Sequence, residues 1–170
     1  MAREALQAEL AEVGEGFWRT SRCDGRSIDW LPLVSISESG LWLGVDRQAE
    51  WILGRLQGKV VSSAHGLSLP QPWLTLLDMS ESDFQDKLGS AATEYGLTAE
   101  DLCALLPIDD VLSMGLRSQS GHWAECATRW LVGRVLREDH VELLREVSNS
   151  RWANQWTRQS ASRLVSAAQR

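Results

Sequence analysis

The 170-residue chain has 17 basic and 23 acidic residues, a net charge of −6, and 44% hydrophobic residues. Its length suits one domain with a self-supporting core, and its composition is that of a globular protein. No apolar run approaches the roughly eighteen residues of a membrane-spanning helix. The acidic amino-terminal segment lacks the apolar block of a signal peptide, so we expect a cytoplasmic protein. Three cysteines at irregular spacing indicate reduced core thiols rather than disulfides.

The first third of the chain gives mixed signals. Residues 2–13 predict an amphipathic helix, because apolar residues recur at helical spacing before two glycines. The polar, basic stretch 19–27 predicts an exposed loop. Residues 28–45 leave two alternatives open, a short β-hairpin over 33–45 or a pair of short helices, since apolar and polar residues alternate around a Ser-Gly turn.

Residues 46–56 predict a helix capped by Asp46. On that helix Trp51 points about 160° away from the apolar stripe, so either the helix is buried on two sides or Trp51 is exposed. We adopt the second interpretation, in which Trp51 is a solvent-facing anchor for a partner. Residues 57–72 contain two glycines and two prolines and predict a loop-rich region.

Helical signals are clearest over residues 80–170, where capping residues and apolar periodicity alternate. The helix at 121–136 is expected to be central to the core, with Trp123 and Trp130 both buried. The predicted fold class is mainly α, a single helical domain over residues 1–170. It is an antiparallel helical array, either a bundle or a HEAT-like stack of helix pairs, with or without the hairpin. The expected helices cover 80–96, 98–106, 107–116, 121–136, 137–148 and 150–169.

Motifs that carry chemistry are absent from the sequence: there is no phosphate-binding glycine loop, zinc-protease motif or nucleophile elbow. His122 and Cys126 stand one helical turn apart, but a metal site needs about two more ligands. We interpret His65 as a loop residue and Asp109-Asp110 as acids in the first turn of a helix. We therefore expect no catalytic residue, cofactor or metal; an enzyme whose site is dispersed along the sequence remains an alternative.

Charge is distributed unevenly along the chain. Residues 147–170 contain four arginines and no acid, while the rest has a net charge of −10. An acidic body disfavours nucleic acid as the principal partner and favours a basic protein. With Trp51 as the anchor, the expected partner-binding residues form two acidic clusters. These are Asp78, Glu81, Asp83 and Asp86, and Glu138, Asp139, Glu142 and Glu146.

The segment S-G-H-W-A-E-C-A-T-R-W-L, residues 120–131, resembles the Trp- and Ala-rich helix of small, acidic, helical bacterial proteins of the toxin-immunity kind. The resemblance includes no functional motif and assigns no binding residue. It implies a non-enzymatic protein that binds and neutralises a basic partner. The alternative is a small helical subunit of a larger defence or nucleoprotein assembly, attached through its basic C-terminal helix. The basic last helix itself has two interpretations: its indoles, Trp152 and Trp156, dock on the body while its arginines face the acidic residues, or the helix contacts nucleic acid or an anionic surface.

Overall fold

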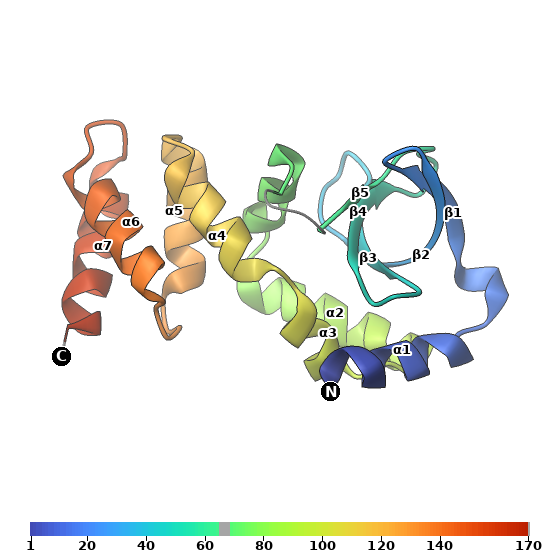
Figure 1. Cartoon of the computed structure of the whole chain (residues 1–170). Helices are drawn as coiled ribbons and strands as arrows, with labels where there is room; N and C mark the ends of the chain where they lie inside the picture. Colours follow the sequence, from blue (N-terminus) through green and yellow to red (C-terminus); the bar gives the residue numbers. More distant parts are fainter. Residues whose placement is uncertain (65–68, 170) are drawn as a thin grey trace. The chain divides into compact units, whose positions relative to one another are not determined.

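The computed structural model describes residues 1–64 and 69–169, so His65 lies outside the described residues. The chain divides into two compact units, Met1–Pro107 and Ile108–Arg170. Helices are combined with a five-stranded antiparallel sheet (Figure 1), so the prediction of a mainly helical fold is wrong. The sheet belongs entirely to the first unit. That residues 1–170 form one domain stays a prediction.

The first unit begins with helix α1, Ala2–Glu12, as the sequence predicted, followed by the short 3-10 helix η1, Glu15–Phe17. The five strands then lie in the sheet in chain order, each antiparallel to the next. They are β1 (Arg19–Cys23), β2 (Arg26–Ser35), β3 (Leu41–Asp46), β4 (Trp51–Arg55) and β5 (Ser62–Ser63).

The sheet curls until its first strand meets the segment before its last. The backbone N–H of Arg22 donates to the Lys59 carbonyl at 2.8 Å, and the N–H of Val61 donates to the Arg22 carbonyl at 2.9 Å. A register shift between Pro32 and Val34 marks a bulge in β2, and bulges bend a strand. The curl encloses a small core of Cys23, Trp30, Ile52 and Val61.

The predicted loop at 19–27 is in fact β1 and the start of β2. Asp24 and Gly25, at φ 49° and 79°, form the two-residue turn between them. Positive φ at both positions is typical of the tight turns that join twisted strands. Of the two alternatives at 33–45, the structure has the hairpin: Ser35 pairs with Trp42 across β2 and β3.

The predicted helix at 46–56 is wrong, because this segment is a turn followed by β4. The Asp46 carboxylate accepts the backbone N–H groups of Gln48 and Glu50, both at 2.9 Å, and so closes a turn rather than capping a helix. Trp51 is only 1% exposed, and its indole N–H donates to the Leu102 carbonyl at 3.2 Å. The prediction of an exposed Trp51 is therefore also wrong, and Trp51 is excluded as a partner anchor.

After the loop-rich region, the 3-10 helix η2 (Gln71–Asp78) leads into α2 (Glu81–Tyr95) and α3 (Ala99–Leu105). The predicted start and end of α2 are confirmed: the Ser80 hydroxyl accepts the Asp83 N–H at 3.1 Å, and the helix stops before Gly96. Helix α2 packs against β2, while α1 and α2 both contact α3. The Glu9 carboxylate of α1 accepts two hydrogen bonds from Thr98, next to α3.

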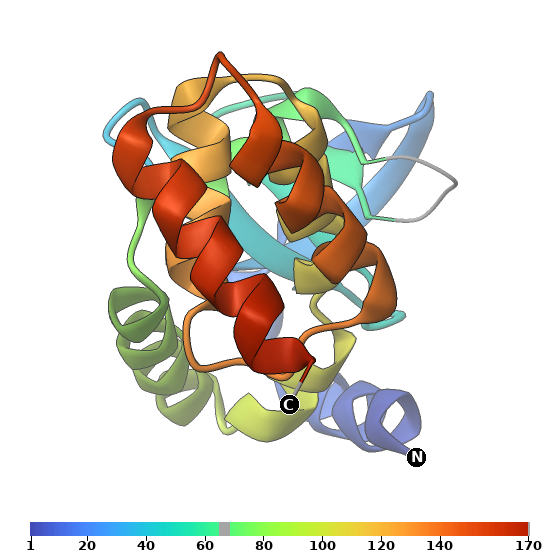
Figure 2. The ribbon, with the colours of Figure 1, turned by 90° about the vertical axis from the view of Figure 1, so that its left-hand side faces the viewer.

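The second unit consists of four helices arranged as two stacked pairs (Figure 2). The first pair is α4 (Ile108–Arg117) with α5 (Gly121–Leu131), and the second is α6 (Glu138–Asn149) with α7 (Gln155–Ala168). Helix α4 contacts α6, and α5 contacts α7. Each of these helices was predicted from the sequence, with boundaries shifted by a few residues.

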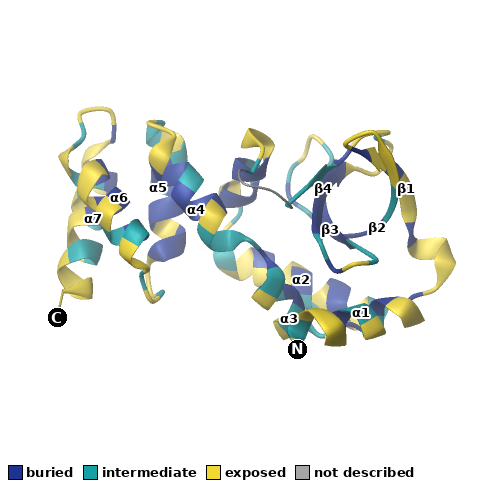
Figure 3. Cartoon of the chain, viewed as in Figure 1, coloured by how far each residue is buried: buried dark blue, intermediate teal, exposed yellow. Residues whose placement is uncertain are grey.

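Helix α5 differs most from its prediction. It ends at Leu131, and Gly133 follows in a turn at φ 85°. Trp130 is buried as expected, but Trp123 is only half-buried. Figure 3 shows how buried and exposed residues are distributed along α5. Val135, which falls within the predicted helix at 121–136, follows this turn and is 99% exposed. No helix within residues 1–64 and 69–169 is long and apolar enough to cross a membrane.

Candidate binding groove

Two adjoining hollows of the first unit lie between α2 and the β2–β3 end of the sheet. Their volumes are about 520 and 580 Å³, and Ser35 and Lys87 line both. We refer to the two together as the α2 groove. The other lining residues are Ile36, Ser37, Glu38, Asp78 and Met79 in the first hollow, and Leu33, Val34, Trp42, Asp86, Ser90, Ala91, Glu94 and Tyr95 in the second.

Helix α2 forms one wall of the groove through two parallel rows of side chains. Residues four apart lie above one another on a helix, so the rows follow from the sequence spacing. Asp86, Ser90 and Glu94 form the more exposed row, and Lys87, Ala91 and Tyr95 form the other. The wall therefore has carboxylates at its rim and a small residue and an aromatic ring further in.

Trp42 provides the aromatic surface on the opposite wall. Its side chain is half-buried, packing against the enclosed core of the sheet while still lining the groove. Tyr95 faces the same hollow, and its ring meets Phe17 edge-on with centroids 5.2 Å apart. Burial, and secondarily the charge of Glu94, raise the pKa of Tyr95, so its hydroxyl remains a neutral hydrogen-bond donor at physiological pH.

The charged groups that line the groove are predominantly acidic. Among the described residues, four carboxylates line it, those of Glu38, Asp78, Asp86 and Glu94, against the single cation Lys87. The Lys87 amine donates to the Ser35 carbonyl at 3.5 Å, which directs its charge toward the end of β2. A concave surface lined by one sign of charge concentrates counter-charged ligands.

The structure divides the first predicted acidic cluster. Asp78 and Asp86 line the α2 groove, whereas Glu81 and Asp83 belong to the first turn of α2 and are not among its lining residues. Sequence reasoning missed Glu38, Glu94 and both aromatic residues. Helical spacing alone could have added Glu94, which is two turns after Asp86. No sequence signal links Glu38 or Trp42 to α2.

The second predicted cluster lies on α6 of the other unit, and part of its charge is compensated within that unit. Asp139 accepts hydrogen bonds from Ser113 at 3.2 Å and from Arg137 at 3.1 Å. Burial alone would raise the pKa of Asp139, but the charges of His140 and Arg137 and the Ser113 hydrogen bond lower it below its usual range. Glu138 and Glu142 are exposed on the same helix. Asp139 thus has a structural role at the α4–α6 contact.

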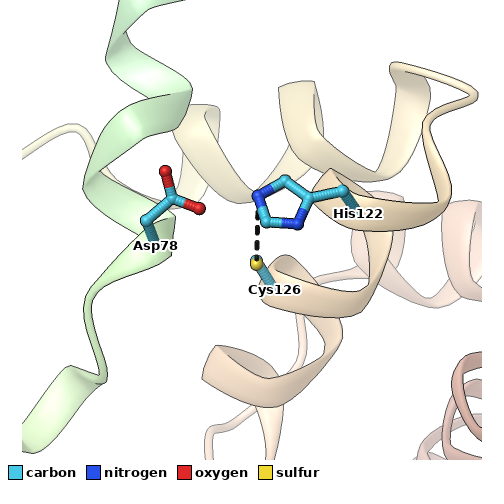
Figure 4. A group of neighbouring side chains, drawn as sticks. All are labelled: Asp78, His122 and Cys126. Atoms are coloured by element: carbon cyan, nitrogen blue, oxygen red, sulfur yellow. Dashed lines mark hydrogen bonds between the residues drawn. The ribbon is translucent and has the colours of Figure 1, made fainter.

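His122 and Cys126, the pair singled out as possible metal ligands, do face each other on α5. The His122 Nε2 and Cys126 Sγ atoms lie 3.9 Å apart (Figure 4). Asp78, also drawn there, belongs to the first unit. Among the described residues of the second unit, no further histidine, cysteine or acid joins the pair.

Comparison with known proteins gives no relative for this chain. No family model, curated protein or solved structure matches it. The resemblance of residues 120–131 to toxin-immunity-type proteins therefore stays a prediction.

Proposed function

We propose that this protein is a non-enzymatic binding protein that takes up a basic segment of a partner protein in the α2 groove. It would act as an immunity- or inhibitor-type protein, neutralising that partner by occupying its basic surface. The observation that carries the proposal is that Asp86 and Glu94 line one hollow together with the half-buried Trp42 and Tyr95, while Glu38 and Asp78 line the adjoining hollow.

The groove combines the two features that a charged, specific complex requires. Long-range attraction by clustered carboxylates speeds the encounter with a basic protein. A tight complex also needs a desolvated anchor, and aromatic side chains dominate such positions. An arginine of the partner can stack on the Trp42 ring while its guanidinium donates to Asp86 or Glu94, joining both features in one contact.

In this proposal Trp42 replaces Trp51 as the aromatic anchor for the partner. Trp42 lies in β3, far from α2 in the sequence, but it lines the same hollow as Asp86 and Glu94. The expected pairing of an acidic cluster with an aromatic anchor is therefore proposed again with a different indole. The cluster on α6 is the weaker candidate, because its Asp139 is already paired with Arg137 and Ser113.

A second candidate function has one observation in its favour. A subunit attached through its basic last helix would need to present aromatic or charged groups there, and Trp152 and Trp156 are exposed. This surface lies in the other unit. Both functions are compatible in one chain, since the two surfaces share no residue.

The test uses a fluorescein-labelled arginine-rich peptide and fluorescence anisotropy at low salt. Reversing two rim charges, with Asp86→Lys and Glu94→Lys, should weaken binding at least about tenfold, equivalent to roughly 1.4 kcal/mol. The matched control is Glu138→Lys with Glu142→Lys, which makes the same charge change on α6. If both pairs of substitutions weaken binding equally, the effect depends on the net charge alone, which would contradict the assignment to the groove.

Trp42 is tested in the same assay with two substitutions. Trp42→Phe retains an aromatic face and should keep most of the binding, whereas Trp42→Leu retains bulk without that face and should speed dissociation. Because Trp42 also packs against the sheet core, the far-UV circular dichroism and melting temperature of both variants are compared with the parent. Unchanged dissociation in a folded Trp42→Leu variant would exclude Trp42 as the anchor.

A further inference from the structure

The start of the last helix exposes two large aromatic side chains. Trp152, just before α7, is 37% exposed, and Trp156, in its first turns, is 45% exposed. The helix packs on the second unit through Thr157 and Ala161 instead, which are fully buried. Each indole therefore leaves a large part of its surface in solvent, although the helix itself is packed on its unit.

One of the two indoles already takes part in a cation–π contact. The Arg129 guanidinium of α5 lies 5.3 Å from the centroid of the Trp156 ring. Arg129 is in turn paired with Glu125, which also accepts a hydrogen bond from Asn154 at 2.6 Å. This network fixes the amino-terminal end of α7 against α5 and leaves part of the Trp156 side chain exposed to solvent.

Helical spacing groups the remaining polar residues beside this ring. Trp156, Gln159 and Arg163 are three and seven residues apart, so they lie along one exposed stripe of α7. Arg158, Gln155 and Ser162 line a shallow groove of about 630 Å³ together with Gln159, Arg163 and Ser148 of α6. We call the stripe and groove, with Trp152, the α7 surface.

The charged side chains of the α7 surface are hydrogen-bond donors. The described residues of its groove include two arginines and no acidic side chain, and residues 147–170 contain no aspartate or glutamate. The apolar residues of α7 that could enter a membrane are few, since Ala161 is buried and Leu164 and Val165 are half-buried. Aromatic faces next to arginine and amide donors match a ligand that carries both flat bases and phosphates.

The negative net charge of the chain comes from the first unit, so it does not disfavour binding of phosphate to the α7 surface. Residues 1–107 contain sixteen acidic and eight basic residues, whereas residues 108–170 contain seven acidic and nine basic residues. Repulsion of phosphate is therefore a property of the first unit. The second unit is weakly basic, and its α7 surface is the part without acids.

We propose that the α7 surface binds single-stranded nucleic acid, with a base stacked on Trp156 and phosphates held by Arg158 and Arg163. Arg151, exposed next to Trp152, extends the phosphate contacts along the strand. The inference goes beyond the α2 groove: it concerns another unit, another ligand and oppositely charged residues, so either proposal can fail without the other.

The test measures anisotropy of a fluorescein-labelled oligothymidylate of about 20 nucleotides, titrated with the full chain. Three phosphate contacts give a slope of about −2 for log affinity against log salt, so affinity should fall roughly twentyfold between about 50 and 200 mM salt. Trp156→Ala should weaken binding at least about fivefold, while Trp156→Phe keeps a stacking face and should stay within about twofold of the parent.

The matched control changes two exposed arginines of the first unit, Arg22→Ala with Arg26→Ala, against Arg158→Ala with Arg163→Ala. Only the second pair should lower both the affinity and the salt slope, while both keep the parent's melting temperature. No binding at low salt, or equal loss in both pairs, would overturn the proposal. Equal affinity for an oligonucleotide duplex or for vesicles containing phosphatidylserine would also overturn it, because neither offers an unstacked base.

Discussion

Replacement of Trp51 gives the sharpest test of the first unit. The side chain is 1% exposed in β4, and its indole N–H bonds to the Leu102 carbonyl at 3.2 Å. Removing a buried aromatic side chain costs about 3–5 kcal/mol, so Trp51→Ala should lower the free energy of unfolding by that amount. Trp51→Phe keeps most of the volume but loses the hydrogen bond to the Leu102 carbonyl, at a cost of about 0.5–1.5 kcal/mol.

Urea unfolding followed by circular dichroism measures these losses, and peptide-resolved hydrogen exchange shows whether they fall in residues 1–107. Trp152→Ala is the control, because the same side chain is removed from a position that is 37% exposed. It should cost clearly less than Trp51→Ala, because more than a third of this side chain is already in solvent. A loss of under about 1 kcal/mol for Trp51→Ala would mean that Trp51 is not in the core, and that the strand assignment of 51–55 is wrong.

Three further outcomes follow from local geometry. Gly44→Ala should strongly destabilise the sheet, because a β-carbon there would lie 2.1 Å from the backbone oxygen of Leu31; a melting temperature equal to the parent's would refute the close approach of β2 and β3. Ser80→Ala should cost about 0.5–2 kcal/mol of unfolding free energy in the same urea series by removing the cap of α2, and an unchanged unfolding free energy would refute the cap. The lowered pKa of Asp139 means that its charge stabilises the fold above the unfolded-state value of about 4, and that this contribution is lost as pH falls through the lower folded-state pKa. Asp139→Asn should therefore be less stable than the parent at neutral pH, with a difference that narrows on acidification; a gap independent of pH would exclude a role for the charge.

The helices after residue 80 could be predicted because each carries local signals. Ser80 at the start of α2 and Gly96 after it are direct marks of a helix start and end. The second unit is built from such helices, and its short connections leave few alternatives. What the sequence did not show was where α5 ends, since Val135 fits the apolar stripe but follows the turn at Gly133.

The sheet was missed for a different physical reason. Asp46 is as suitable for closing a turn as for capping a helix, because its carboxylate accepts backbone N–H groups in both. The run Trp51-Ile52-Leu53 is buried on both faces of β4, so it lacks the alternation that identifies a strand. The polar residues of β1 likewise look like a loop until their pairing with β2 is known.

The candidate site was only half visible for a related reason. Asp78 and Asp86 could be found as acids near the start of a helix, but Trp42 and Glu38 join them only after α2 packs against β2. Such proximity depends on tertiary structure, which residue spacing does not encode. The same limit explains why the indole of Trp51 was assigned the role now proposed for Trp42.

The most direct measurement of the central claim is a nuclear magnetic resonance titration of the nitrogen-15-labelled protein with an arginine-rich peptide. The nine tryptophans give indole N–H signals that report separately on each part of the molecule. Binding in the α2 groove should shift the Trp42 indole and the backbone amides of Asp86, Ser90 and Glu94, and leave the Trp152 and Trp156 indoles unchanged. Shifts confined to residues 138–146 of α6, or a titration that leaves the Trp42 indole and the α2 amides in place, would contradict the account.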